Sequence, residues 1–381
     1  MSQLIPARTF PPGEFIQEEI DARGWGQMDL AEIMGRPQKA ISDLIAGKVA
    51  ITAETAKQLG EAFGTSAEYW MNLESAYQLG QIRRDNTNAI SRRADIYEFA
   101  PVREMQKRGW LEESKNVEDL ERQILHFFQK SSIEECAAPI EHAAKQSPNA
   151  SVPALAAWLR RSQQLADRMP VSGKFSAASL EHCCDTLKHL LSDREEIRHI
   201  PRILSDHGIR FLIVEHLQRT KIDGACFWLD NQRPVIAMSV RYDRIDNFWF
   251  VLAHELAHVR NRDGQTRYTV SDIDVTLVGE EATDDEHLPE RERKANAFAI
   301  EFLVPQVRLS GFIARMNKLY YRNRIESFAK SLSIHPGIVV GQLQRRKEID
   351  YKHHRQLLDK VRDLAISNAL TDGWGHEPLP V

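Results

Sequence analysis

Three short apolar runs between residues 208 and 240 constrain the fold of this chain more than any other feature of its sequence. The runs GIRFLIVEHL, GACFWLD and RPVIAMSV are rich in β-branched and aromatic residues and are separated by turn residues, a pattern typical of strands. The sequence on either side of them favours helices. We therefore expect a multidomain, mainly α protein whose C-terminal part is an α+β domain with a small sheet.

The first 80 residues predict an all-α domain of short helices with tight turns. The second expected helix stops at Gly35, and the third has Pro37 near its first turn and Gly47 past its end. This placement matches the preference for proline at the start of a helix and glycine after its end. Thr65 and Glu68 have the spacing of a capping box and predict the start of a fifth helix.

The chain has 381 residues, enough for several domains with cores of their own. We predict an N-terminal domain over 1–80 and a helical connecting region over 81–199. The domain with the sheet is expected over 200–346, followed by a C-terminal helix and tail over 347–381. The last residues, TDGWGHEPLPV, are expected to be irregular.

Charge and cysteine content exclude some classes of protein. A net charge of −4 excludes a polycation that coats nucleic acid, so any DNA contact has to come from a local patch. The four cysteines form no CxxC pair and predict a reduced, cytoplasmic setting. The N-terminal residues lack the apolar segment of a secretion signal, and no apolar run approaches the length of a membrane span. We therefore expect no membrane partner.

Residues 27–48, QMDLAEIMGRPQKAISDLIAGK, have the pattern of two helices joined by a tight turn. In a helix-turn-helix motif the second helix enters the major groove of DNA, and a dimer binds a roughly palindromic operator. Glutamine suits adenine, arginine and lysine suit guanine or phosphate, serine is permissive, and aspartate either accepts from cytosine or repels phosphate. The predicted contacts to double-stranded operator DNA are Arg36, Gln38, Lys39, Ser42, Asp43 and Lys48.

The charge of the first 80 residues opposes this interpretation. Six basic residues stand against eleven acidic ones, which is unfavourable for binding phosphate. Three of the six bases nevertheless cluster at the expected reading edge, and an arginine-rich segment begins at Arg83. The alternative is a helical interaction module that dimerises and does not read DNA.

The stretch FWFVLAHELAHVRNRDG, residues 248–264, contains His254, Glu255 and His258. On a helix the two histidines lie one turn apart on the same face and can point two imidazoles at one cation. Glu255 lies about 100° around the helix, where its carboxylate can reach a water on that cation. Two nitrogen ligands, an open position and a neighbouring base are what a zinc hydrolase needs. Since the spacing alone also fits three polar residues on an ordinary helix, a third ligand is needed.

The third ligand is sought on a later helix. A third histidine in the metzincin arrangement is excluded, because Asn261 and Gly264 occupy the positions that it needs. Glu292 is the best candidate, since it lies one turn before the buried face of the helix ERERKANAFAIEFLVP. Asn296, four residues later, can hydrogen-bond a ligand. The rivals, in or near the acidic loop, are Glu281, Asp285 and Glu290.

The segments NFWFVLAHELAHV, ERERKANAFAIEFLVP and SIHPGIVVGQLQRR together resemble the ImmA/IrrE family of gluzincin-like metallopeptidases, over roughly 200–346. The resemblance implies a zinc ion bound by His254, His258 and Glu292, with Glu255 as the catalytic base. It also implies a part in cleaving or controlling transcriptional repressors.

The N-terminal residues, from about 11 to 79, resemble the HigA-type antitoxins among the Xre-like repressors, most specifically at TSAEYWMNL. The resemblance implies binding to the chain's own promoter and, as for many such proteins, a partner toxin. A homodimer fits the two-fold operator that helix-turn-helix proteins bind.

Peptide hydrolysis also needs a group that stabilises the oxyanion. Tyr242, Arg241, Arg244 and His335 are the candidates for this role or for substrate contact, although Tyr242 also fits a packing role and His335 a helix or turn cap. The strand PVIAMSV, just before the HELAH helix, is a candidate edge for an extended peptide, with a plain core strand as its alternative.

The combined hypothesis is a cytoplasmic transcriptional regulator that carries a zinc peptidase behind its helix-turn-helix domain and cuts a protein substrate. One alternative is an antitoxin-like repressor whose zinc site is structural or sensory. Another is a toxin-binding protein whose C-terminal domain docks a partner.

Overall fold

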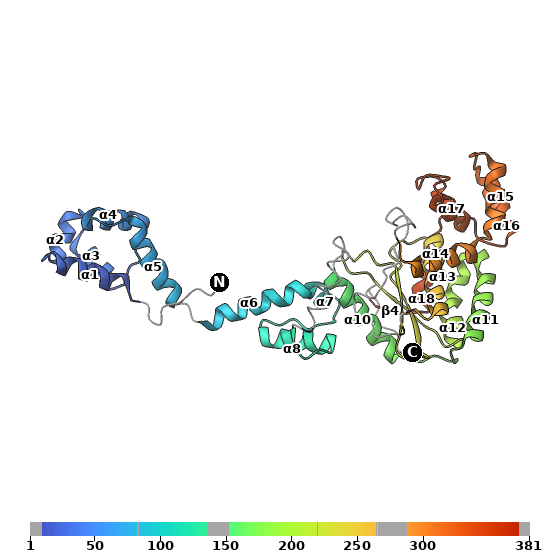
Figure 1. The fold of residues 1–381 in the computed structure, drawn as a ribbon, viewed down its shortest axis with the longest axis horizontal. Coiled ribbons are helices and arrows are strands. Elements are labelled where there is room, and N and C mark those ends of the chain that lie inside the picture. The colour runs from blue at the N-terminus through green and yellow to red at the C-terminus, as the bar shows by residue number, and fades with distance from the viewer. Residues whose placement is uncertain are drawn as a thin grey trace. The chain divides into compact units, whose positions relative to one another are not determined.

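A computed structural model describes residues 10–81, 84–133, 135, 152–218, 220–263, 265 and 288–372. The chain divides into two compact units, Met1–Arg93 and Ala94–Val381 (Figure 1). The domain limits predicted at 80, 199 and 346 stay predictions. The mainly helical class with a small sheet is confirmed.

In its described residues, 10–81 and 84–93, the first unit is all-α around one apolar core. The residues that close this core include Ile16, Leu30, Ile41, Leu59 and Trp70. Its helices are α1 (Pro12–Ala22), α2 (Gln27–Ile33), α3 (Gln38–Ile45), α4 (Ala53–Phe63) and α5 (Ala67–Gln81), and α6 (Arg84–Phe99) spans the limit between the two units.

The start of α5 differs from the capping box predicted at Thr65. Ser66 caps the helix, because its hydroxyl accepts the backbone N–H of Tyr69 at 3.1 Å. The hydroxyl of Thr65 instead accepts the indole N–H of Trp70 at 2.8 Å. A buried indole needs an acceptor for its N–H, and this need competes with capping for the threonine oxygen.

The second unit is built on a four-stranded mixed sheet. The strands are β1 (Arg210–Val214), β2 (Gly224–Trp228), β3 (Pro234–Met238) and β4 (Leu370–Asp372). Their order is β2-β3-β1-β4, with β2 antiparallel to β3 and the other pairs parallel. The three predicted strands are therefore present, and a fourth comes from the tail that was predicted to be irregular from Thr371 onward.

The strand order corrects one prediction. The strand PVIAMSV contains β3, which lies between β2 and β1 and so has no open edge for a peptide. The edge strand on this side of the described sheet is β2, which packs against the HELAH helix.

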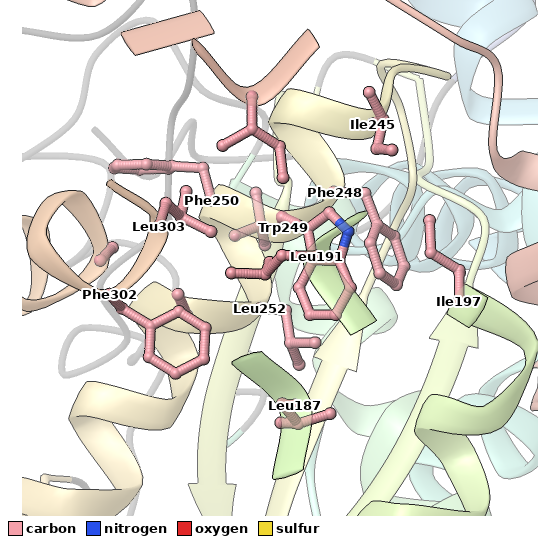
Figure 2. Close-up of a cluster of buried hydrophobic side chains, with 14 of the residues drawn as sticks. Leu187, Leu191, Ile197, Ile245, Phe248, Trp249, Phe250, Leu252, Phe302 and Leu303 are labelled. Atoms are coloured by element: carbon pink, nitrogen blue, oxygen red, sulfur yellow. The ribbon is translucent and has the colours of Figure 1, made fainter. Parts of the chain in front are cut away.

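The HELAH helix is α13 (Ile245–Asn261), and it is buried over most of its length because it lies between the sheet and other helices. Its apolar side chains Phe248, Trp249 and Leu252 are in the centre of the core (Figure 2). The helices of the unit that contact it most are α14 (Glu290–Leu303) and α17 (Pro336–Arg345). The remaining helices are α7 (Val102–Lys107), α8 (Val117–Phe128), α10 (Val152–Arg168), α11 (Ala177–Lys188), α12 (Ile200–Asp206), α15 (Gln306–Met316), α16 (Arg322–Ser331) and α18 (Arg362–Ser367), with 3-10 helices η1 (His189–Ser192), η2 (Arg194–His199) and η6 (Arg355–Leu357).

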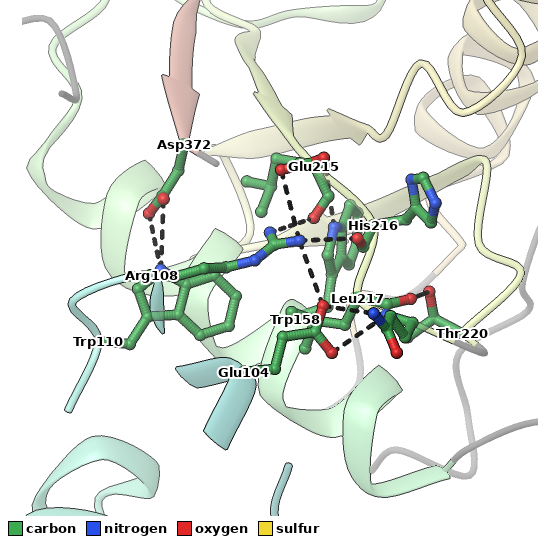
Figure 3. A network of polar contacts seen from close by, with 11 residues as sticks. Glu104, Arg108, Trp110, Trp158, Glu215, His216, Leu217, Thr220 and Asp372 are labelled. Carbon is green, nitrogen blue, oxygen red and sulfur yellow. Dashed lines mark hydrogen bonds and ion pairs between the residues drawn. The ribbon is translucent and has the colours of Figure 1, made fainter. Parts of the chain in front are cut away.

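Helices of the predicted connecting region pack on the sheet. The Arg108 guanidinium donates to the carbonyls of Glu215 and His216 at 2.7 and 2.8 Å, just beyond the end of β1 (Figure 3). The Trp158 indole N–H donates to the Val214 carbonyl at 2.9 Å. These contacts satisfy backbone acceptors that the short sheet leaves unpaired.

No single helix among the described residues is long and apolar enough to cross a membrane, although the bent pair α14 and α15, at 70°, passes a test of length and composition.

Candidate functional sites

His254 and His258 lie on the face of α13 that packs against α14, with their Nε2 atoms 2.9 Å apart. The two residues are 2% and 6% exposed. The i to i+4 spacing on a buried helix forces the two imidazoles toward one point.

Glu292, in the first turn of α14, brings a carboxylate to the same point. Its Oε2 lies 3.1 Å from His254 Nε2, and its Oε1 lies 3.3 Å from His258 Nε2. Small buried residues farther along α14, Ala295 and Ala299, allow the two helices to approach. His254, His258 and Glu292 thus form a buried group that can hold a metal ion.

The opposite nitrogen of each histidine has an acceptor of its own. Asn296 Oδ1 lies 3.0 Å from His254 Nδ1, and Asp263 Oδ2 lies 2.9 Å from His258 Nδ1. When both Nδ1 atoms donate, both Nε2 atoms present lone pairs to each other and to the Glu292 carboxylate. Three acceptors then converge without a donor, and Glu292 Oε1 is buried without a hydrogen bond. This donor set fits a cation that prefers nitrogen and oxygen ligands.

The pKa values of the group describe what it does without metal. Burial lowers the pKa of His258, but its hydrogen bond to Asp263, its close contact with Glu292 and the charges of Glu255 and Glu292 outweigh burial and raise that pKa to about 10. Burial opposes ionisation of Glu292, yet the two histidines hold its pKa well below the usual range of a carboxyl. The metal-free group therefore keeps a proton on its nitrogens, which a metal has to displace.

Glu255 lies beside the edge strand β2. A Cβ at Gly224 would be only 2.7 Å from Glu255 Oε1 and 2.6 Å from Val251 Cγ1. Only glycine leaves room for this carboxylate, which is 1% exposed. The Glu255 side chain, which is next to the candidate metal ligands, is thus held between α13 and β2.

The remaining predicted residues of this domain lie in other contacts. The guanidinium of Arg241 covers the Tyr242 ring at 4.4 Å and pairs with Asp223, while Arg244 pairs with Asp246. The ring of His335 caps α17 through the N–H of Gly337 and lies 3.4 Å from the Asp359 carboxylate. An oxyanion role for Tyr242 or His335 stays a prediction. Of the rival ligands, Glu290 is exposed and pairs with Lys294, whereas Glu281 and Asp285 lie outside the described residues.

Two residues near the ligands were not predicted. Asp263 follows the end of α13 in a turn where Arg262 has a left-handed backbone, and its carbonyl accepts the indole N–H of Trp228 in β2 at 3.0 Å. The second unpredicted residue is Gly224, which makes room for Glu255.

A cavity of about 650 Å³ opens beside Asp263 and the first turn of α14. Its lining residues are Asn261, Asp263, Pro289, Glu290, Arg291 and Lys294.

In the first unit, α3 presents a polar face. The predicted contacts Gln38, Lys39 and Ser42 are exposed. Arg36, which precedes the helix, is partly buried because its guanidinium bonds to Gln58 at 2.6 Å. The other two predicted contacts, Asp43 and Lys48, form an ion pair at 3.8 Å.

Comparison with known proteins assigns both units. Residues 16–70 match the family model described as helix-turn-helix, and residues 204–333 match the model described as IrrE N-terminal-like domain, of a peptidase family. The N-terminal residues are 33% identical over 73 residues to the uncharacterized HTH-type transcriptional regulator YddM of Escherichia coli (strain K12), covering 19% of this chain and 78% of that protein. The chain belongs to the helix-turn-helix regulators. Its helix-turn-helix domain is joined to an IrrE-like domain that holds the metal-ligand group.

The helix-turn-helix domain is similar to HigA antitoxins. Antitoxin HigA-1 of Vibrio cholerae is 36% identical over 72 residues, covering 19% of this chain and 68% of that protein. The Pseudomonas aeruginosa antitoxin HigA, solved with the higBA promoter, is 31% identical over 22% of this chain and 91% of that chain, with a TM-score of 0.21. An antidote protein of the HigA family from Coxiella burnetii is 30% identical over 22% of this chain and 92% of that chain, with the same TM-score of 0.21.

Proposed function

We propose that this chain is a DNA-binding transcriptional regulator whose IrrE-like domain is a zinc-dependent peptidase acting on a protein substrate. The observation that carries the proposal is the convergence of His254, His258 and Glu292 beside a buried Glu255. A structural zinc site would have no need of a carboxylate in that position, whereas a hydrolase requires a base next to the metal.

The side chains divide the chemistry among them. A zinc ion held by the three ligands would supply Lewis acidity, which acidifies a water and polarises a carbonyl. Glu255 takes the proton of the attacking water and delivers it to the amine that leaves when the peptide bond breaks. Asn296 and Asp263 hold the two imidazoles in the tautomer that leaves Nε2 for the metal.

The edge strand β2 provides a place for the substrate. An extended peptide that adds to β2 would run past Gly224, whose missing side chain leaves room for the Glu255 carboxylate against the strand. The backbone of the substrate would then lie next to both the base and the ligands. The proposed docking edge is therefore β2, in place of the strand PVIAMSV, for which the sequence left a plain core strand as the alternative.

For the first unit we propose promoter DNA as the partner and α3 as the reading helix, with Gln38, Lys39 and Ser42 at the base edges. A homodimer would match a two-fold operator. Similarity to HigA antitoxins supports this part of the proposal.

The substitution Glu255→Gln tests the peptidase. It removes the base and keeps the side-chain shape, so cleavage should fall by about 10²–10⁴-fold while zinc stays bound. Comparing the proteomes of cells with wild-type and Glu255→Gln protein should show the substrate accumulating in the variant. Glu290→Gln, which changes an exposed glutamate of the same domain, is the matched control and should behave as wild type. Unchanged cleavage would remove Glu255 from the base role, and identical proteomes with zinc retained would favour a structural or sensory metal site.

A further inference from the structure

A strongly basic part of the second unit, from Gln306 to Lys347, is here called the basic lobe. It contains nine arginines and lysines but a single acidic residue, Glu326, in a chain whose net charge is −4. Its helices α15 and α16 pack through Phe312 and Phe328, whose rings stack with centroids 4.3 Å apart. The lobe thus carries a local excess of positive charge in a chain that is acidic overall.

The cations of the basic lobe are largely unpaired. Glu326 pairs with Arg322 at 2.7 Å. Elsewhere on the same unit, exposed or half-exposed arginines such as Arg122 and Arg198 have carboxylate partners. Six exposed cations of the lobe have no carboxylate within 4.0 Å among the described residues, namely Arg308, Arg315, Lys318, Arg324, Lys330 and Arg346. An ordinary solvated surface intersperses both signs.

Local helix stability does not explain these charges. Arg308 lies in the first turn of α15, where no acidic residue of the helix accompanies it and where a cation is disfavoured by the helix dipole. Two carboxylates that touch the lobe from outside have other partners. Glu301 accepts the N–H of Gln306 at 3.0 Å, and Glu348 accepts the hydroxyl of Tyr320 at 2.7 Å.

The placement of the cations suits a long polyanion. Arg308 and Arg315 are seven residues apart and so lie on the same side of α15, about 10 Å apart along its axis. Arg308 of α15 donates to Ser331 of α16 at 3.4 Å, and Arg346, just after α17, donates to Ser310 of α15 at 3.2 Å, which holds these two cations near the contacts between the helices. Duplex DNA presents a charge about every 1.7 Å along its axis, so such a surface meets several phosphates.

Helix α17 does not offer a face for base reading. Helix α17, which follows α16 after a short turn, is buried at Ile338, Val339 and Leu343 and is packed on α13. It therefore has no free face to insert into a groove, and the exposed arginines and lysines of the lobe are better suited to contacts with phosphate.

We propose that the basic lobe binds the phosphate backbone of double-stranded DNA as a second DNA contact of the chain. The first unit needs such help, because most of its described cations are paired internally, among them Arg36 with Glu54 and Lys48 with Asp43. A second contact on the same chain raises the effective concentration of the first. Arginine also matches phosphate through its planar fork.

The test measures binding of the full-length chain to an unrelated duplex by fluorescence anisotropy at several salt concentrations. The triple variant Arg315→Gln, Lys318→Gln, Arg324→Gln should bind at least about tenfold more weakly, and the slope of log K against log salt should fall by about 2–3. The control triple Arg122→Gln, Arg202→Gln, Lys352→Gln removes the same charge from exposed residues that have carboxylate partners. It should leave the slope nearly unchanged.

Equal losses in the two triple variants, or no loss in either, would overturn the proposal. Loss of binding to poly-glutamate with DNA binding retained would assign the lobe to an acidic protein instead and would also overturn it. Lys39→Ala, tested on the chain's own promoter fragment, reports separately on the helix-turn-helix. Loss of promoter binding through α3 and loss of phosphate binding through the basic lobe can therefore be told apart.

Discussion

At the scale of single residues, two acceptors outside the ligand set decide what the metal group can bind. Asn296 and Asp263 each accept a hydrogen bond from the Nδ1 of one histidine, so that both Nε2 atoms are left for the metal once it displaces the extra proton of His258. The main-chain carbonyl of Asp263 also accepts the indole N–H of Trp228, which connects this partner of His258 to the edge strand β2. Asp263, just after the end of α13, and Asn296, in the middle of α14, thus orient the two histidine rings for the metal.

Asp263→Asn should weaken zinc binding by about 10–100-fold, because the charge that holds His258 is lost. Competition with a chromophoric chelator measures the affinity. Asp230→Asn is the matched control, since its carboxylate bonds only within a surface turn, to Gln232 and Arg233. If Asp263→Asn binds zinc like the control, Asp263 has no part in positioning His258.

Zinc affinity should depend on pH in a defined direction. The folded, metal-free group holds a proton on His258 up to a pKa of about 10. Zinc takes the neutral imidazole, so binding at pH 7.5 should release about one proton, and affinity should rise about tenfold per pH unit. Without metal, the raised pKa adds stability that is complete below the unfolded value and is lost as pH rises through about 10. Calorimetry in buffers of different ionisation enthalpy counts the proton, and a count of zero would contradict the assigned hydrogen bonds.

The sequence was sufficient to name the residues that helix periodicity brings together. His254 with His258, and Glu292 with Asn296, are each four residues apart on a helix. It was not sufficient to predict the roles of Asp263 and Gly224. The contact of Asp263 depends on a left-handed turn after α13, and that of Gly224 depends on how β2 packs against α13. The positions of Tyr242 and His335 depend in the same way on neighbours that are distant in sequence.

At the scale of secondary-structure elements, strand order was the feature that local pattern could not supply. All three predicted strands form, but which of them is the edge depends on pairings between segments far apart in the chain. The short β4 pairs with β1, and its Asp372 accepts the indole N–H of Trp110 (Figure 3). Asp372 also pairs with Arg161. A three-residue strand with little apolar character relies on such side-chain contacts, which a sequence pattern does not reveal.

Asp372→Ala should destabilise the second unit by roughly 2–3 kcal/mol, because it removes charged hydrogen bonds and leaves the Trp110 donor buried without a partner. Urea unfolding followed by tryptophan fluorescence measures the loss. Asp230→Ala removes an exposed carboxylate and should cost less than about 1 kcal/mol. Equal effects of the two substitutions would show that Asp372 does not hold β4 in place.

At the scale of the whole molecule, the chain separates two kinds of chemistry. The first unit carries an exposed polar helix face, and the second buries a group of ligands beside a sheet edge. Both families were predictable, because each depends on short motifs within continuous segments. The unpaired charge of the basic lobe could not be predicted from the sequence, since pairing depends on which carboxylates the fold places nearby.

The central claim is that His254, His258 and Glu292 form a zinc site. The most direct measurement is the metal content of the purified full-length chain by mass spectrometry, combined with X-ray absorption at the zinc edge. We predict one zinc per chain with nitrogen and oxygen ligands, retained in Glu290→Ala and lost in Glu292→Ala. A folded wild-type chain that contains no zinc and takes up none when zinc is added would contradict the account.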